Sequence, residues 1–195
     1  DTITNINDSI SELDNFAILS PLSDNPDYPN YRINLSKSKN YDGSIIREVE
    51  EIDGYSMIIN KNFFINNIFF DEKFFMYLEN VDLCLRTKKN NGKLLIIMKS
   101  KIHHLGAQAV DDKYIEEVEL SRNWHWMWSK FYFNKKHRGF FVSSLLGFTS
   151  LLGNFLKYTI YTITFNKKRN IYRMRMSGFI NSLLGRQSWY RPEIN

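Results

Sequence analysis

The sequence is poor in cysteine and in targeting signals. Cys84 is the single cysteine among 195 residues, so no disulfide can form within the chain, and a reducing cytoplasm is favoured. The chain begins with Asp1 rather than Met and shows no signal peptide, so we expect a fragment of a longer protein. Its length fits one domain, or a modest domain with an appendage.

Acidic side chains are nearly absent from one end of the chain. Residues 120–195 carry 13 Lys and Arg but only one acid, Glu193, a balance of +12. Residues 1–119 carry 13 Lys and Arg and 20 Asp and Glu, a balance of −7. The whole chain is 43% hydrophobic and 15% aromatic, which is enough for a packed core. We therefore expect a folded domain followed by a segment that faces an anionic partner, either nucleic acid or a membrane surface.

The hydrophobic pattern predicts alternating helices and strands. We expect an amphipathic helix within residues 2–14, a buried strand at 16–19 stopped by Pro21, an irregular loop at 21–44 and a strand at 52–59. A further helix should begin near Glu79 and end at residues 90–92, with Gly92 as its left-handed cap. The unbroken apolar run at 94–98 fits a strand buried on both faces, as in α/β sheets.

Two carboxylates open the helix predicted at residue 79. Glu79 and Asp82 lie one turn apart on the same face, and Asp82 and Arg86 are spaced for an ion pair. A well-capped helix would explain these carboxylates without any function, because the helix dipole favours them. His103 and His104 lie just past the next strand, where open α/β sheets place ligands. A carboxylate and an imidazole that meet there could bind a divalent cation or transfer protons, although each histidine alone is more often structural.

Several motifs follow one another in a fixed order. They are Asp53–Ile59, Phe70–Arg86, Gly92, His104-Leu105-Gly106, Arg122-Asn123, Lys130 and Ser188–Pro192. Together they resemble bacterial family 2 glycosyltransferases, most closely the rhamnosyltransferase-like subgroup that builds cell-surface polysaccharides. The similarity covers most of residues 16–195. It implies an α/β fold, the C-terminal part of a GT-A (nucleotide-diphospho-sugar transferase) domain over residues 1–135, followed by a helical tail at 136–195.

The resemblance also implies an activity. Such enzymes transfer a sugar, with inversion, from a nucleotide-sugar donor to a growing polysaccharide or lipid-linked acceptor, using Mg²⁺ or Mn²⁺. A carboxylate removes the acceptor proton, while the cation and positive groups stabilise the departing diphosphate. The residues implied by this resemblance are Glu79, Asn80 and Asp82 as the catalytic segment, Asp1 and His104 as metal ligands, and Asp53, Gly54, His103 and Arg122 as substrate-binding residues.

The sequence departs from the family pattern in two respects. Many relatives have Glu-Asp where this chain has Glu79-Asn80, and an asparagine cannot act as a base, so Glu79 is expected to take that role. The half of a GT-A domain that grips the nucleotide is absent, and Asp1-Thr2 matches the end of an Asn-Pro-Asp-Thr metal motif. We therefore expect the 195-residue chain to be inactive by itself; a non-catalytic remnant or a membrane-surface binding module is the alternative.

Apolar and cationic blocks alternate in the tail. Phe140–Leu156 is 17 residues without a charge, at the short limit for a spanning helix, and it contains several polar side chains. Tryptophans at 124, 126 and 128 precede it, and Lys167-Lys168-Arg169 follow it. This pattern favours a tail that lies on an anionic membrane surface at the inner face of the cell membrane. A helical cap on the domain core is the alternative, and the long uncharged stretches argue against nucleic acid.

Overall fold

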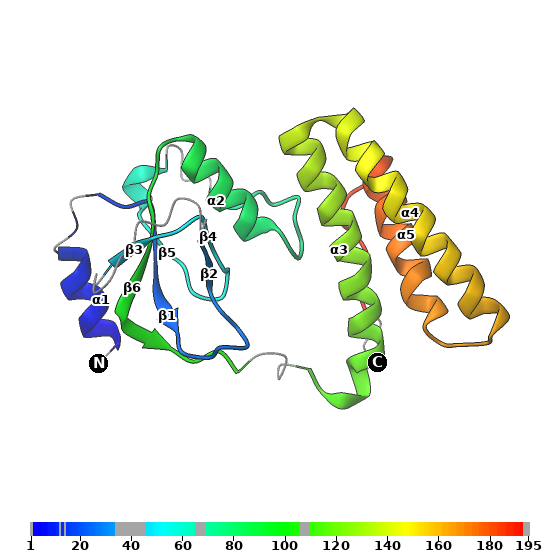
Figure 1. Ribbon diagram of the computed structural model, residues 1–195, viewed down its shortest axis with the longest axis horizontal. Coiled ribbons are helices and arrows are strands. Elements are labelled where there is room, and N and C mark those ends of the chain that lie inside the picture. The colour runs from blue at the N-terminus through cyan, green and yellow to red at the C-terminus, as the bar shows by residue number, and fades with distance from the viewer. Residues whose placement is uncertain are drawn as a thin grey trace. The chain divides into compact units, whose positions relative to one another are not determined.

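A computed structural model of the chain describes residues 2–11, 13, 15–33, 46–64, 69–105 and 110–192. It is a mixed α/β structure that divides into two compact units (Figure 1). The first unit comprises residues 1–71 and 79–106, and the second comprises residues 72–78 and 107–195. The boundary expected at residue 135 falls inside the helix α3, Ile115–Arg138. The helix cannot be divided there because its aromatic side chains pack within the second unit along much of its length.

The first unit is built on a four-stranded mixed sheet with the strand order β3-β6-β1-β5. β1 and β6 run parallel, and the outer strands β3 and β5 run antiparallel to their neighbours. A separate two-stranded antiparallel sheet pairs β2 with β4. The strands are β1 (Ile18–Ser23), β2 (Tyr31–Arg32), β3 (Ile46–Glu48), β4 (Glu51–Ile52), β5 (Ile58–Ile59) and β6 (Leu94–Ile102).

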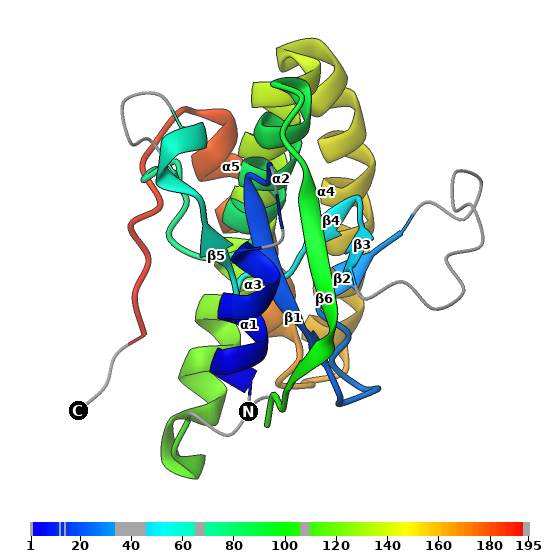
Figure 2. The same cartoon turned by 90° about the vertical axis from the view of Figure 1, so that its left-hand side faces the viewer.

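Apolar side chains of the central β1–β6 pair are buried on both faces. Leu19, Leu95 and Ile97 pack with residues of the helix α1 (Thr2–Ser11), which lies against these strands in Figure 2. The opposite face packs against the helix α2 (Glu79–Lys89) through Ile18, Leu94, Ile96, Leu83 and Cys84. Successive residues of a strand point to opposite faces, so burial of both faces requires an uninterrupted apolar run. The prediction made from residues 94–98 is therefore confirmed.

Two strand predictions were wrong in their extent. β1 continues through Pro21 to Ser23. The register of the β1–β6 pair shifts directly after Pro21, and a proline is tolerated at such an irregularity because a ladder bond is already lost there. The strand expected at 52–59 is two strands, β4 and β5, in different sheets. The Gly54 amide donates to the Asp53 side chain at 2.7 Å, which stabilises the turn between them.

The helix α2 ends where the sequence predicted, but a different residue carries the left-handed backbone. Asn91 has φ of 58°, its N–H donates to Lys88 at 3.0 Å, and the Gly92 N–H donates to Thr87 at 2.9 Å. This is a Schellman motif with asparagine in place of glycine. Gly92 is required for space instead, since a Cβ there would lie 2.6 Å from Thr87 and 2.9 Å from Ala17.

Three long helices dominate the second unit: α3, α4 (Phe140–Ile163) and α5 (Arg169–Leu183). A short 3-10 turn, η3 (Asp112–Tyr114), leads into α3, and another, η1 (Lys61–Phe63), lies in the first unit. α3 and α5 approach closely at Gly178, where a Cβ would lie 2.1 Å from the carbonyl oxygen of Trp124. The core between the helices contains Met127, Phe131 and Phe179.

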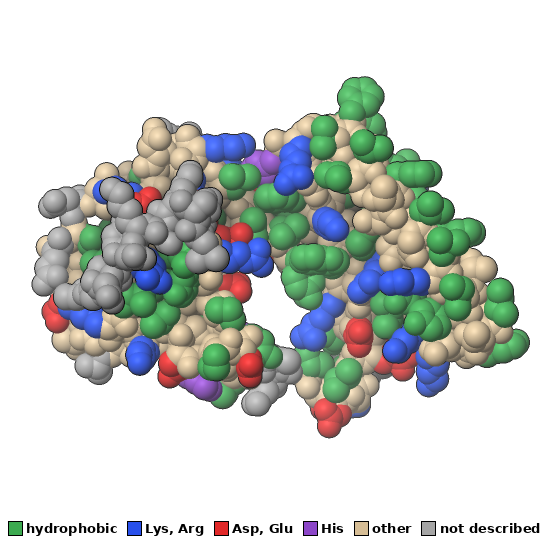
Figure 3. All heavy atoms as spheres, viewed as in Figure 1, with side chains coloured by type: hydrophobic (Ala, Val, Ile, Leu, Met, Phe, Trp, Pro, Cys, Tyr) green, Lys and Arg blue, Asp and Glu red, His purple; other side chains and the backbone are tan. Residues whose placement is uncertain are grey.

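Hydrophobic side chains remain exposed along α4. Figure 3 shows them gathered on the outer side of this helix, and they include Phe141, Leu145, Phe148, Leu152, Phe155, Leu156, Ile160 and Ile163. Within the described residues, α4 is the one helix long and apolar enough to cross a membrane, and 11% of its most apolar stretch is buried. Lys157 interrupts the run without ending the helix, and its ammonium group lies 5.5 Å from the Tyr172 ring of α5.

Two of the tryptophans expected at a membrane boundary are core residues. Trp124 and Trp128 are buried, and their indole N–H groups donate to the Ser177 hydroxyl at 3.1 Å and to the Arg186 carbonyl at 3.0 Å. Trp126 is exposed on the same helix. The aromatic block in α3 therefore serves mainly to pack the second unit.

Candidate functional site

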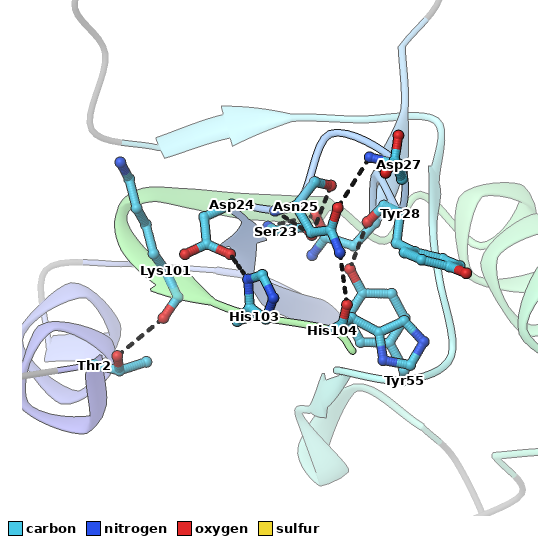
Figure 4. Close-up of polar contacts among 11 residues, drawn as sticks. Thr2, Ser23, Asp24, Asn25, Asp27, Tyr28, Tyr55, Lys101, His103 and His104 are labelled. Carbon is cyan, nitrogen blue, oxygen red and sulfur yellow. Dashed lines mark hydrogen bonds and ion pairs between the residues drawn. The ribbon is translucent and has the colours of Figure 1, made fainter. Parts of the chain in front are cut away.

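The candidate site lies beyond the carboxyl ends of β1 and β6. These strands are parallel and neighbouring, so the residues that follow them meet at one edge of the sheet. Asp24 and Asn25 follow β1, and His103 and His104 follow β6 (Figure 4). The Asn25 side chain donates to the His104 carbonyl at 2.8 Å, and His103 Nδ1 lies 2.8 Å from Asp24 Oδ1. The structure thus brings both predicted histidines to this edge.

The His104 ring packs against two tyrosines, as Figure 4 shows. It stacks on Tyr55, with centroids 4.2 Å apart and planes 16° from parallel, and meets Tyr28 edge-on at 5.2 Å. The Tyr55 hydroxyl donates to the Tyr28 carbonyl at 3.0 Å. Burial raises the pKa of the Tyr55 phenol, so this hydroxyl keeps its proton and can donate. The three rings form a half-buried aromatic surface beside the exposed His103–Asp24 pair.

Glu79 begins α2 next to Gly54. A Cβ at Gly54 would lie 3.4 Å from the Asn80 Cβ and 4.0 Å from Glu79 Oε1, so the glycine leaves space beside the carboxylate. Glu79 Oε2 is buried and has no hydrogen-bond partner within the parts of the chain that are described. Buried carboxylate oxygens are normally paired, so this one lacks the partner that such a group usually has. Gly54 directly precedes Tyr55, so the Glu79 carboxylate lies beside the turn that carries one ring of the aromatic surface.

Asn80 has a structural role. Its side-chain amide donates to the carbonyl of Ile52 in β4 at 3.1 Å, and the Ile52 amide lies 3.4 Å from the Cys84 sulfur. Burial raises the pKa of the Cys84 thiol to about 11, so it remains protonated at neutral pH. These contacts attach the start of α2 to β4. A carboxylate at position 80 could not donate to that carbonyl.

The backbone immediately before Glu79 is left-handed at two residues that are not glycine. Tyr77 has φ of 70° and Leu78 has φ of 67°. Such conformations cost about 1–3 kcal/mol each and persist where the surroundings hold them, often at functional sites.

Asp82 is occupied by an ion pair. Its side chain is fully buried, and Oδ2 lies 2.8 Å from Arg86 Nε, which confirms the pairing predicted from their spacing. Arg86 also donates to the Phe69 carbonyl. Asp82 is fully buried whereas Glu79 is half-buried, so Glu79 is the carboxylate of this segment that can meet a ligand.

The remaining predicted site residues are placed as follows. Asp53 and Gly54 are exposed in the turn between β4 and β5, Arg122 is exposed on α3 in the second unit, and Asp1 lies outside the described residues. Sequence reasoning missed Asp24, Asn25, Tyr28 and Tyr55. Two features of the sequence could have indicated them: the first three residues lie in the long polar loop, and Tyr55 lies next to Gly54. In the parts of the chain described, no group of three His, Cys, Asp or Glu side chains could hold a metal ion.

No protein-family model, no curated protein and no solved structure matches this chain. The resemblance to family 2 glycosyltransferases therefore rests on the ordered sequence motifs.

Proposed function

We propose that this chain is the acceptor-side part of an inverting glycosyltransferase, which moves a sugar from a nucleotide-sugar donor to a cell-surface polysaccharide or lipid-linked acceptor. The observation that carries the proposal is the unpaired, buried carboxylate oxygen of Glu79 beside Gly54. A group in that state can accept a hydrogen bond from a hydroxyl and then its proton. The ordered motifs around Glu79 supply the class of reaction.

In the proposed reaction Glu79 removes the proton of an acceptor hydroxyl. The hydroxyl oxygen forms a bond to the anomeric carbon of the donor, and the bond from that carbon to the diphosphate breaks. The nucleoside diphosphate leaves with the electron pair, and this single displacement inverts the anomeric centre. Asp53 and Gly54 line the acceptor side, while His103 and His104 contact donor or acceptor groups.

A divalent cation, Mg²⁺ or Mn²⁺, belongs to the proposal through the resemblance. Its function would be to neutralise charge on the departing diphosphate. The described residues do not supply three ligands together, and Asp1, one of the expected ligands, lies outside them.

We also propose that α4 holds the protein on the anionic inner face of the membrane. At about 36 Å, the helix is long enough to cross a bilayer. Cationic groups flank both of its ends, however, with Lys135, Lys136 and Arg138 before it and Lys167, Lys168 and Arg169 after it. Crossing would carry one of these clusters to the far side, whereas a helix lying in the interface keeps both beside anionic headgroups.

The test of the catalytic proposal is substitution of Glu79 by glutamine. The assay uses the full-length natural protein, with any residues that the gene encodes before Asp1, and measures nucleoside diphosphate release from a panel of UDP- and dTDP-linked sugars. Loss of a general base should lower turnover by about a hundredfold or more. The matched control, Glu48→Gln, changes an exposed glutamate of β3 and should leave turnover intact. Full turnover by Glu79→Gln would exclude the assigned role.

A non-catalytic membrane-surface binding module is the second candidate. It is favoured by the exposed apolar side of α4 and by the structural use of Asn80, neither of which requires sugar chemistry. The wild-type full-length protein distinguishes the two: vesicle binding without turnover of any donor in the panel would favour the binding module.

A further inference from the structure

Two cationic side chains from different helices meet at one tyrosine ring in the second unit. The Lys157 ammonium group of α4 and the Arg175 guanidinium of α5 each lie 5.5 Å from the centroid of the Tyr172 ring. The Tyr161 ring of α4 stacks on Tyr172, with centroids 5.4 Å apart and planes 12° from parallel. Attraction to an aromatic ring holds a cation in place but does not neutralise its charge. Two positive charges thus lie close to a single ring.

No carboxylate pairs with these two cations among the described residues. Residues 140–183, which contain α4 and most of α5's length up to its end, include no Asp or Glu, and Glu193 lies outside the described residues. The ion pairs of the described chain involve neither Lys157 nor Arg175. Two neighbouring cations without a counter-ion create a positive potential that attracts an anion.

The Arg175 guanidinium is oriented by a neutral partner on α3. Its Nε donates to the Asn123 side-chain oxygen at 2.7 Å, and the Asn123 amide nitrogen donates to the Glu119 carbonyl at 2.9 Å. Within the described part of the chain, the two Nη groups of Arg175 have no acceptor. A planar guanidinium suits two oxygens of a phosphate, and the Lys157 ammonium group can contact a third. A phosphomonoester carries about −1.5 to −2 charges at neutral pH, which matches two cations.

The two cations lie at the border of the apolar side of α4. Lys157 directly follows Leu156, and Ile160 lies on the next turn; these two apolar side chains are 54% and 57% exposed. Successive residues of a helix are rotated by about 100°, so Lys157 lies between that apolar side and the side that faces α5. In a helix that lies in the membrane interface, such border positions are at the depth of the headgroups. The adjoining apolar side chains favour a lipid over a soluble phosphate compound.

We propose that Lys157 and Arg175 bind the phosphomonoester headgroup of an anionic membrane lipid, at the border between α4 and α5. The inference rests on the proposed contact of α4 with the membrane and adds to it the chemical group that is recognised. General attraction to an anionic surface treats lipids of equal charge alike. A site with two cations instead prefers a terminal phosphate to a phosphodiester, which carries a single charge and has fewer free oxygens.

Flotation of the 195-residue chain with two kinds of vesicle tests this site. One contains phosphatidic acid, whose phosphate is terminal, and the other contains enough phosphatidylglycerol to give the same surface potential. The wild type should bind phosphatidic acid about fivefold more tightly, and Lys157→Gln should remove most of this preference. The matched control is Lys167→Gln, an exposed lysine between α4 and α5. It loses the same charge, so it should weaken binding to both vesicles and keep their ratio.

The outcomes separate this site from the proposed membrane contact. Equal binding of the wild type to both vesicles, or the same ratio in Lys157→Gln as in Lys167→Gln, would overturn the phosphate site and leave the membrane contact of α4 standing. Binding to neither vesicle would overturn both.

Two further measurements address the second cation and the source of the phosphate. Arg175→Lys keeps the charge but loses the planar fork, so binding to phosphatidylglycerol should remain while the preference for phosphatidic acid declines. An unchanged preference in that variant would contradict the role of Arg175. Soluble glycerol 3-phosphate, at the concentration of the accessible phosphatidic acid and with sodium chloride as the ionic-strength control, should leave the preference intact. Its loss would assign the site to a soluble phosphate and overturn the lipid assignment.

Discussion

His125 is a polar side chain enclosed in an aromatic core, and it remains neutral there. Burial lowers the pKa of His125, the hydrogen bond to the Tyr190 carbonyl partly opposes this, and the nearby Arg191 lowers it further. Protonation would also destroy the acceptor that Nδ1 offers to the Ser188 hydroxyl at 2.8 Å. The stability of the second unit is therefore linked to pH through one imidazole.

We predict that the second unit loses stability as the pH decreases below about 6.5, the ordinary pKa of histidine in an unfolded chain. Between that value and the lower folded pKa the unfolded chain binds more protons, so acid favours unfolding, and the contribution is fully present above the window. All four tryptophans lie between residues 124 and 189, so their fluorescence during urea titration reports on this unit. His125→Gln should weaken the pH dependence; an identical dependence in that variant would contradict the assignment.

Among individual residues, some members of the candidate site could be identified from the sequence and others could not. Glu79 and the Asp82–Arg86 pair follow from helical spacing, which is a local property. The stacking of Tyr55 on His104 joins positions 49 residues apart and depends on how β5 and β6 both pair with β1, which no local pattern contains. His125 gave no signal of its own within an aromatic block.

Helix contacts in the second unit depend on small residues. At Gly178 the backbone of α5 lies against the carbonyl of Trp124, and an added methyl group would clash with rigid main chain. Gly153 of α4 has nothing within 4 Å of an added Cβ. Replacement by alanine would therefore cause a clash at Gly178 and none at Gly153.

We predict that Gly178→Ala destabilises the second unit by about 1–3 kcal/mol, because helix α5 must move to accommodate the methyl group. Gly153→Ala should stabilise it by about 0.5–1 kcal/mol through the higher helix propensity of alanine. Urea unfolding followed by tryptophan fluorescence measures both changes. Equal shifts in the same direction would show that the close approach of α3 and α5 is wrong.

Helices and strands could be predicted where the local sequence pattern alone determines them. The apolar run of β6 and the start of α2 follow from composition and spacing, and both were confirmed. The division of residues 52–59 between two sheets depends on partners elsewhere in the chain. The tryptophans of α3 were misassigned because aromatic side chains favour a core and a membrane interface alike.

On the scale of the molecule, the charge asymmetry and the apolar side of α4 point to a lipid surface. We predict that the chain floats with vesicles containing anionic lipid and less with neutral ones, and that high salt weakens binding because screening reduces the cationic contribution. Leu145→Glu places a charge at a side chain 71% exposed on α4 and should reduce flotation severalfold. Ile3→Glu is the matched control, a side chain 70% exposed on α1 of the first unit. Equal flotation of the two variants would locate the lipid contact elsewhere.

The two units also determine how the chain can fold during synthesis. β1 is made early, but its parallel partner β6 follows more than 70 residues later, after residues 72–78 have already emerged. Those seven residues pack with helices that the ribosome has not yet produced. A nascent chain that stops before β6 leaves one edge of β1 unpaired and Leu19 uncovered, which makes it a substrate for chaperones and a starting point for aggregation.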